Sequence, residues 1–427
     1  MKKVKIILFA VIFLFLGIII EKINNREVNV LDNDKVTIKK DKNMLSMMLE
    51  TEAKSGNYVM TARESWPTDG YVFNSKLSVC EHGSELSWDD INKRVLMSGN
   101  VSDKCYVYFD VYVPPTIADF CSSGDTLATC VKNFGDQGPD ISNIYIHSSN
   151  LTNGAGDNSY RYAGASDAVN NFVCFGSDAT PCPADNLYRI IGVFEDKVKL
   201  IKYDYATSTL LGTDGDYYIT DSLYEPTYKG SLTTIDKYGW NNSVQKNTWS
   251  ESNLNKINLN TNFITNIGSE WANKIATTTW KVGGNTYAKI SEVMLSEAYQ
   301  NEITNAVTAN TTDGKIEYNA KIGLMYVSDY GFAAAPSSWI ITLYNYSGNV
   351  NGLTIRSLNW MYMGYTEWSI SRNADASDNV FRVNDTGYVD DRGVINFYGC
   401  RPAFSLEAFV TYGSGFGTSS DPIIIGD

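Results

Sequence analysis

The sequence predicts an α+β protein in which a small all-β domain precedes a larger mixed domain. Two observations predict this class. Short apolar or alternating runs separated by turn signals are typical of strands and occur along most of the chain. Helical spacing of apolar residues is confined to a few stretches in the second half. An apolar content of 43% over 427 residues is enough for two or three domains with hydrophobic cores.

The N-terminus carries an export or anchoring signal. Lys2, Lys3 and Lys5 precede an unbroken apolar run of fifteen residues, 6–20. This length fits a signal-peptide core or a short membrane span. The run ends in bulky β-branched residues instead of small cleavage residues, which favours an uncleaved anchor. Residues 1–22 are therefore predicted to be a signal-anchor or signal peptide. The basic flank is expected to stay cytoplasmic, so the protein is single-pass with an extracellular C-terminal part, or is secreted.

A polar stalk and a small β domain are expected next. Residues 23–56 are rich in Lys and Asp and read as a stalk with a short helix at 44–50. Residues 57–115 are predicted to form the small all-β domain, which the adjacent prolines at 114 and 115 end because proline cannot donate to a β-ladder. The expected strands are 71–73, 85–88, 94–97 and 105–113.

Six of the seven cysteines fall into three pairs adjacent in the sequence, and none has CxxC spacing. The simplest pairing joins Cys80 to Cys105, Cys121 to Cys130 and Cys174 to Cys182. Oxidised pairs suit an exported protein, whereas reduced buried thiols are the alternative. Residues 116–186 hold four of these cysteines and are predicted to be a disulfide-stapled connector. Cys400 lies in an apolar run and is expected to be a buried small hydrophobe.

Residues 187–427 are predicted to form the main α+β domain. Two apolar runs, 187–194 and 198–203, flank an acidic turn and predict a β-hairpin. Helices are expected from Ser250 to Leu259 and over 263–275. Further strands are expected at 277–282, 321–327, 397–406 and 423–425.

The composition excludes some partners and ligands. A formal net charge of −13 spread along the chain argues against a nucleic-acid partner, which needs a basic face. With two histidines in the chain, a Cys/His zinc site lacks ligands, so no metal is predicted. Five tryptophans could stack on sugars, although core packing is their default role. These are Trp240, Trp249, Trp280, Trp360 and Trp368.

The candidate ligand-binding residues lie in a charged, turn-rich stretch near the C-terminus. Arginines recur there at ten-residue spacing among aspartates, on loops between apolar anchors. The candidates are Arg372, Asp375, Asp378, Arg382, Asp385, Asp390, Asp391 and Arg392. Planar guanidinium groups suit the recognition of carboxylates or sugar hydroxyls. The alternative is a set of intramolecular ion pairs on a solvated face, each worth little.

No catalytic residue is predicted. Ser328 and Asp329 have no histidine partner in this domain, which removes the ordinary serine-hydrolase arrangement. Asp375 with Asp378, or Asp385 with Asp390, could form a glycosidase pair, but carboxylates are common in exposed loops. Whether the protein is an enzyme is left open, with binding favoured.

Five ordered blocks resemble an uncharacterised domain family of exported bacterial proteins and phage tail proteins. The blocks are NLYRIIGVF (186–194), NTWSESNLNKINLNTNFI (247–264), KIGLMYVSDYGFA (321–333), NWMYMGYTEWSISR (359–372) and YGCRPAFSL (398–406). Members of this family end in a Tyr-Gly-Val-Arg-Pro-Ala strand, in which Cys400 here replaces the valine. The closing strand is also similar to the C-type-lectin-like fold of formylglycine-generating enzymes and of variable retroelement ligand-binding proteins.

This resemblance implies that 187–427 is a C-type-lectin-like domain that presents a loop-rich binding face. Formylglycine-generating enzymes use a cysteine pair, and Cys400 is the single cysteine after Cys182, so their oxidase activity is not expected. Trp240-Asn241-Asn242 is similar to part of a lectin calcium motif without its upstream partner, so no cofactor is predicted and calcium is kept as an alternative. The predicted function is adhesin-like binding of a surface glycan or protein without catalysis. An extracellular carbohydrate hydrolase and a structural surface protein are the alternatives.

Overall fold

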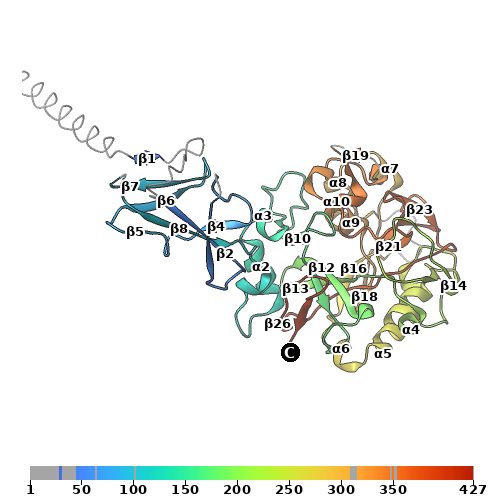
Figure 1. The fold of residues 1–427 in the computed structure, drawn as a ribbon. Helices are drawn as coiled ribbons and strands as arrows, with labels where there is room; N and C mark the ends of the chain where they lie inside the picture. Colours follow the sequence, from blue (N-terminus) through green and yellow to red (C-terminus); the bar gives the residue numbers. More distant parts are fainter. Residues whose placement is uncertain are drawn as a thin grey trace, which may run out of the picture. The chain divides into compact units, whose positions relative to one another are not determined.

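The fold is known from a computed structural model, which describes residues 28–30, 45–62, 65–100, 102–307, 315–346, 349–350 and 353–426. The chain divides into two compact units, Met1–Pro114 and Pro115–Asp427 (Figure 1). Strands outnumber helices and the sheets are mixed, so the predicted α+β class is confirmed. The predicted anchor at 1–22 lies outside the described residues. In the part of the chain that the structure describes, no helix is long and apolar enough to cross a bilayer.

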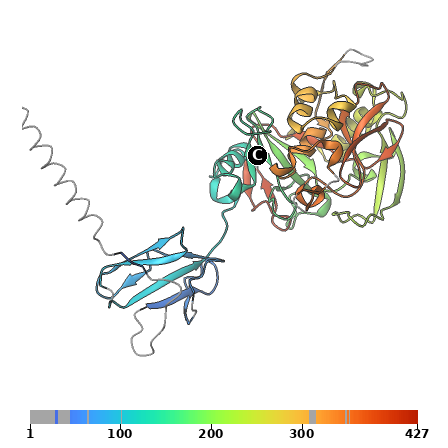
Figure 2. The ribbon, with the colours of Figure 1, turned by 90° about the horizontal axis from the view of Figure 1, so that it is seen from above.

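Unit 1 is built from two sheets whose strands are mostly antiparallel, drawn in blue in Figure 2. One has the order β1-β7-β6; the other has the order β3-β2-β8-β4, with β5 also pairing with β8. Its strands are β1 (Val28–Val30), β2 (Leu45–Glu50), β3 (Tyr58–Thr61), β4 (Tyr71–Phe73), β5 (Val79–Cys80), β6 (Glu85–Asp89), β7 (Arg94–Ser98) and β8 (Cys105–Val111). The four strands expected from the sequence are all present. Leu49, Val95, Val107 and Phe109 are buried between the sheets with Trp66.

The prediction of a short helix at 44–50 is wrong, because residues 45–50 form β2. This strand runs parallel to β8, with Leu45 opposite Cys105 and Leu49 opposite Phe109. Strand β1 likewise pairs with β7 of the same unit. The described parts of the predicted stalk, 23–56, therefore contribute strands to the β unit. Pairing with strands far along the chain overrides the local helical spacing of the apolar residues.

All three predicted disulfides are present. Cys80 and Cys105 are directly opposite each other on β5 and β8. The other two bridges join Cys121 to Cys130 and Cys174 to Cys182. Cys400 is a free thiol and is fully buried, as expected.

Unit 2 is organised around a nine-stranded sheet with the order β18-β25-β13-β12-β11-β27-β26, to which β10 and β9 are added through β12. The strands are β9 (Ile144–Ile146), β10 (Tyr160–Tyr162), β11 (Phe172–Cys174), β12 (Leu187–Phe194), β13 (Lys197–Lys202), β18 (Ile322–Gly323), β25 (Ala403–Ser405), β26 (Tyr412–Ser414) and β27 (Ile423–Ile425). The predicted hairpin is confirmed as β12 and β13, which are antiparallel neighbours at the centre. Its apolar residues belong to one large core.

Helices are short and surround this sheet; in the view of Figure 1, α8 to α10 lie above its central strands and α4 to α6 below them. The helices are α2 (Leu127–Gly135), α3 (Pro139–Ser142), α4 (Ser208–Leu211), α5 (Ile264–Asn266), α6 (Ser269–Asn273), α7 (Tyr287–Ser291), α8 (Leu295–Tyr299), α9 (Val327–Phe332) and α10 (Ile355–Leu358). The 3₁₀ turns are η2 (Ile117–Phe120), η3 (Ala184–Asn186), η4 (Trp249–Glu251), η7 (Pro336–Ser338) and η8 (Leu343–Asn345), and the π-helices are η5 (Leu254–Phe263) and η6 (Gln300–Thr304).

Smaller sheets complete unit 2. They have the orders β14-β15-β24, β16-β17, β19-β20 and β21-β22-β23. Their strands are β14 (Tyr217–Ser222), β15 (Thr234–Gly239), β24 (Phe397–Tyr398), β16 (Thr278–Lys281), β17 (Glu317–Ala320), β19 (Asn349–Val350), β20 (Leu353–Thr354), β21 (Glu367–Arg372), β22 (Asn379–Val383) and β23 (Val389–Gly393). Two expected strands are only partly correct. The run 321–327 ends as the start of α9, and 397–406 is interrupted between β24 and β25.

The segment 116–186 is not a separate connector. Strand β10 pairs with β12, and β11 lies between β12 and β27. Leu127 and Val131 of α2 are buried in the same core as the hairpin. Its many Gly, Asn and Ser residues suggested a loop, but long-range strand pairing makes it part of the main domain.

A buried ion pair joins β21 to the segment before β25. The Nε of Arg401 donates to Oε2 of Glu367 at 2.6 Å, and its Nη2 donates to Oε1 at 2.7 Å. The same Nη2 also donates to the carbonyl of Met361 at 2.7 Å. Both charged side chains are 1% exposed. A buried ion pair joined by two hydrogen bonds is stable only if both partners are present.

Arg401→Met should lower the free energy of unfolding by about 3–5 kcal/mol, because Glu367 is then left buried without its counter-charge. The double variant Arg401→Met with Glu367→Leu should recover a large part of that loss. Urea unfolding of both variants measures the two values, with Arg392→Met as the exposed control. A loss below about 1 kcal/mol in the single variant would contradict a central role for the pair.

Replacing Cys80 and Cys105 together by alanine should lower the stability of unit 1 by about 3 kcal/mol, because the bridge closes a loop of 25 residues in the unfolded chain. Calorimetry should show the transition of unit 1 move to lower temperature. The double alanine variant of Cys174 and Cys182 is the control, and it should leave that transition where it is. If the transition of unit 1 moved by the same amount in both variants, the assignment of this bridge to unit 1 would be contradicted.

Candidate functional site

A cavity of about 570 Å³ in unit 2 is lined by residues of β10, β12, β13, β16, β25, α8, η6 and α9 and by neighbouring loop residues. Its charged lining residues are Asp157, Arg161, Glu195, Lys197, Lys199, Lys281 and Asp329. Aromatic rings and hydroxyl groups supply most of the remaining surface. A concave site with a few convergent polar groups is where proteins commonly bind small molecules.

Strand pairing places the two buried cations of the cavity. Arg161 lies on β10 opposite Gly192 of β12, and a side chain at Gly192 would collide with the carbonyl of Tyr160. Glycine at this position therefore lets the two backbones approach. Lys199 lies on β13 opposite Ser405 of β25, and both side chains line the cavity. Lys197 lines it as well, since alternate residues of a strand share a face.

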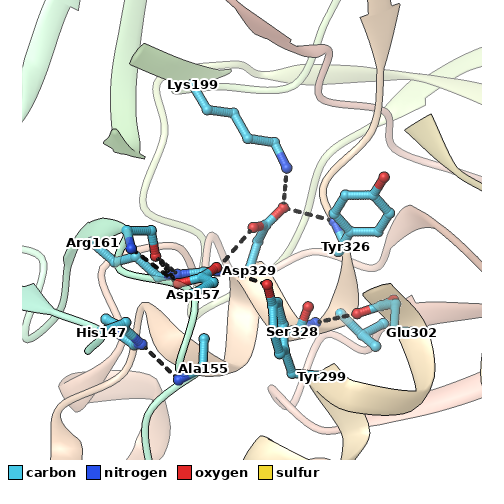
Figure 3. Close-up of polar contacts among 12 residues, drawn as sticks. His147, Ala155, Asp157, Arg161, Lys199, Tyr299, Glu302, Tyr326, Ser328 and Asp329 are labelled. Atoms are coloured by element: carbon cyan, nitrogen blue, oxygen red, sulfur yellow. Dashed lines mark hydrogen bonds and ion pairs between the residues drawn. The ribbon is translucent and has the colours of Figure 1, made fainter. Parts of the chain in front are cut away.

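Asp329 lies between the two cations (Figure 3). Its Oδ2 accepts a hydrogen bond from Nζ of Lys199 at 2.5 Å, and its Oδ1 is 3.6 Å from Nη1 of Arg161. The backbone N–H of Tyr326 donates to Oδ2 at 3.0 Å, which caps the first turn of α9. The helix start thus fixes the position of this carboxylate.

Asp157 holds the other side of Arg161. Its Oδ2 accepts from Nη2 of Arg161 at 2.6 Å and from the hydroxyl of Tyr299 at 2.7 Å. Its Oδ1 accepts from the backbone N–H and the hydroxyl of Ser159 at 3.0 and 2.6 Å. Burial opposes ionisation, but Arg161 and these donors outweigh it, so the pKa of Asp157 lies well below its ordinary value.

Aromatic rings surround both cations. The Nζ of Lys199 is 4.5 Å from the ring centre of Tyr326 and 5.3 Å from that of Trp280. The guanidinium of Arg161 is 4.6 Å from the ring centre of Phe194. Burial lowers the pKa of Lys199, while the Asp329 carboxylate opposes this shift. Ring faces and one carboxylate therefore replace most of the water around each charge.

Glu302 lies behind this network, on the π-helix η6 that follows α8. It accepts hydrogen bonds from the backbone N–H of Ser328 at 3.1 Å and from the hydroxyl of Ser371. Burial raises the pKa of Glu302 to about 7, and the hydrogen bonds from the two serines oppose that shift. Glu302 therefore changes its charge near neutral pH.

His147 is buried close to the network but plays no part in it as a base. Its Nδ1 accepts a hydrogen bond from the backbone N–H of Ala155 at 3.0 Å, and its ring packs on Phe332 and Trp339. Burial lowers the pKa of His147 to about 3. The imidazole is therefore neutral and serves the packing of the core.

The predicted arginine-rich face is arranged differently from the expectation. The prediction that its three arginines lie on loops is wrong, because Arg372, Arg382 and Arg392 lie on β21, β22 and β23. Arg372 is buried and donates to the carbonyls of Val282 and Val307 at 3.1 and 3.2 Å. Its role is to tie these segments together.

Arg382 is also buried and forms a two-point pair with Asp390, at 2.8 and 3.3 Å. Its guanidinium covers the ring of Tyr398. Arg392 is exposed and lies 3.0 Å from the same Asp390. The ion pairs of Asp390 with Arg382 and Arg392 match the alternative in part, although the pair with Arg382 is buried and not on a solvated face. One of the three arginines, Arg392, is left in reach of a ligand.

The remaining predicted aspartates are scattered. Asp375 and Asp378 are exposed, and Asp375 accepts from the backbone N–H of Tyr287 at 2.8 Å. Asp385 and Asp391 are half-buried, and Asp391 accepts from two asparagine side chains, both at 2.7 Å. The structure therefore brings together Arg382, Asp390 and Arg392, and none of the eight predicted residues lines the cavity.

Sequence reasoning missed Arg161 and Lys199, although a signal was present. Each is a charged residue inside a short strand, flanked by apolar or aromatic neighbours. Asp329 had been considered only as part of a serine-hydrolase arrangement. The five candidate tryptophans are all at most 2% exposed, so they pack in the core, and Trp280 also lines the cavity.

Comparisons of the chain with protein-family models, with curated proteins and with solved structures found no match. The geometry of the site is therefore the basis for the function.

The raised pKa of Glu302 predicts a pH-dependent stability. Because its pKa is higher in the folded chain than its ordinary value of 4.5, the stability it contributes is complete below pH 4.5 and is lost as pH rises through about 7. Glu302→Gln should therefore change stability little at pH 5 and increase it at pH 8, by on the order of 3 kcal/mol at most. Urea unfolding at pH 5, 6, 7 and 8 measures this difference.

Glu292→Gln, a change at an exposed position, is the matched control and should show no such trend. A stability difference between wild type and Glu302→Gln that stays constant over this pH range would contradict the raised pKa.

Proposed function

We propose that this chain is a cell-surface ligand-binding protein, adhesin-like and without catalysis, whose cavity in unit 2 holds part of a glycan. One observation carries the proposal. Arg161, Lys199 and Asp329 are almost fully buried and yet line a cavity of about 570 Å³. Burying charges is costly, so a protein that arranges three of them around an open space is expected to use them for recognition.

The chemistry of the lining suits a sugar ring. Hydroxyls of Thr277 and Thr279 and the charged groups offer hydrogen bonds, while Phe194 and Trp280 offer apolar faces. A sugar presents hydroxyls at its edge and C–H groups on its faces, so it needs both kinds of surface. A protein partner would be held by the same groups through an exposed polar side chain.

The pairing of the carboxylates favours binding over hydrolysis. A glycosidase needs one carboxyl group with a raised pKa to act as the acid. Asp157 has a lowered pKa and four hydrogen-bond donors, and Asp329 is held by Lys199 and the start of α9. Glu302 has a raised pKa but does not line the cavity.

The same proposal includes a C-type-lectin-like organisation of unit 2 and an anchor at residues 1–22. Strand β25 beside the hairpin, with long loops and short helices around the main sheet, supports the first. The basic flank and the apolar run 6–20 support the second. Three disulfides also fit exposure to an oxidising environment.

Purified full-length protein in mild detergent should bind a subset of an array of glycans. Thr278→Trp should abolish that binding, because Thr278 lines the cavity on β16 and a large ring there fills the space. Arg392→Ala, on the exposed part of the predicted arginine-rich face, is the control and should bind as wild type does. Thermal unfolding of each variant checks that it is folded.

Each alternative gives a different result. Loss of binding in Arg392→Ala with retention in Thr278→Trp would move the site to the β21–β23 sheet. Release of free sugar from a bound glycan by the wild-type protein would favour the hydrolase. Absence of any binding above the level of Thr278→Trp would contradict the proposal.

A further inference from the structure

The cavity has more hydrogen-bond donors than acceptors at its charged end. Arg161 has five N–H groups, and its hydrogen bonds among the described residues use two of them, on Ser159 and Asp157. Lys199 has three, and its hydrogen bond to Asp329 uses one. Three N–H groups of Arg161 and two of Lys199 are thus left for a ligand or water.

The acceptors of the same network are largely occupied. Asp157 accepts four hydrogen bonds, which is the capacity of a carboxylate. Oδ2 of Asp329 accepts two, from Lys199 and the N–H of Tyr326. Oδ1 of Asp329 has Arg161 at 3.6 Å, beyond ordinary hydrogen-bonding distance. Within this buried network, five N–H groups of the two cations are thus matched by one carboxylate oxygen with unused acceptor capacity, Oδ1 of Asp329.

The buried cations, and not the outer ones, are the groups left for a ligand. Arg161, Lys197, Lys199 and Lys281 are the positive lining residues, and Asp157, Glu195 and Asp329 are the negative ones. Lys281 pairs with Glu317, and Nζ of Lys197 is 3.5 Å from Asp196, two carboxylates outside the lining. Arg161 and Lys199 are therefore the cations whose unused N–H groups can receive an acidic group.

We propose that the ligand of this cavity is an acidic sugar, a hexuronate residue, whose carboxylate lies against Arg161 and Lys199 and accepts their remaining hydrogen bonds. This inference rests on the proposed function and specifies the ligand of the same site. A carboxylate offers four acceptor positions without a donor, which matches the excess of donors. Hydroxyls of Thr277 and Thr279 suit the sugar ring better than they suit a peptide carboxyl terminus.

Isothermal titration of the full-length protein with D-glucuronate, its methyl ester and D-glucose tests this inference without any variant. The ester keeps the sugar ring and its hydroxyls, adds one methyl group and lacks the charge. Glucuronate should bind at least about tenfold more tightly than the ester or glucose, because it alone satisfies buried charged donors. Its affinity should also fall as salt rises, whereas that of glucose should not.

The double variant Lys199→Gln with Asp329→Asn removes one cation together with its counter-charge. Glucuronate should then bind about tenfold more weakly, and the binding of glucose should change less than about threefold. The exposed pair in unit 1, changed as Lys93→Gln with Asp90→Asn, is the control and should change neither affinity. If the cavity variant does not fold, the comparison of glucuronate with its ester decides.

Equal affinities for glucuronate and its ester would overturn the acidic-sugar assignment and leave the glycan-binding function in place. Tighter binding of an N-acetylated dipeptide with a free carboxyl terminus than of glucuronate would overturn it in favour of a peptide. Binding of none of these probes, together with no binding to a glycan array, would overturn the proposed function itself.

Discussion

The ion pair between Arg401 and Glu367 is the constraint on which the arrangement of unit 2 depends. Arg401 precedes β25, a strand of the nine-stranded sheet, and Glu367 begins β21 of a separate sheet. Because both side chains are buried, each charge needs the other, and the two hydrogen bonds hold β21 against the segment before β25. Met361 adds a third acceptor from another segment. A buried two-point pair of this kind restricts which packings are allowed, in addition to any stability it contributes.

The same rule explains why the cavity looks as it does. Arg161, Lys199 and Asp329 are as buried as core residues, and the network around them balances most of their charge through carboxylates, a helix start and aromatic rings. Such a network is rigid, because moving one member leaves another without its partner. The network has fewer hydrogen-bond acceptors than its cations have N–H groups. A ligand in the cavity can complete it, which links the cost of buried charge to recognition.

The contrast with the β21–β23 sheet shows what separates a binding site from a set of structural contacts. Arg382 and Asp390 satisfy each other in a two-point pair, and Arg372 donates to backbone carbonyls. Their hydrogen bonds are directed inward and hold strands and loops together. In the cavity, by contrast, Lys199 and Arg161 keep N–H groups beyond those used by Asp329 and Asp157. The arginines of the β21–β23 sheet and the cations of the cavity thus have different roles. The former use their N–H groups on protein acceptors, and the latter keep some N–H groups unused.

The sequence by itself determined the local and pairwise features: the β12–β13 hairpin, four of the eight described strands of unit 1, the three disulfides and the burial of Cys400. These follow from short-range alternation, turn residues and cysteine spacing, which are read within a few residues. Only the tertiary structure decided that 45–50 is a strand, that 116–186 belongs to the main sheet and that Arg372 is buried. Strand pairing and side-chain burial depend on partners tens or hundreds of residues away. The cavity, assembled from β10, β12, β13, β16, β25, α8, η6 and α9, has no local pattern for the same reason.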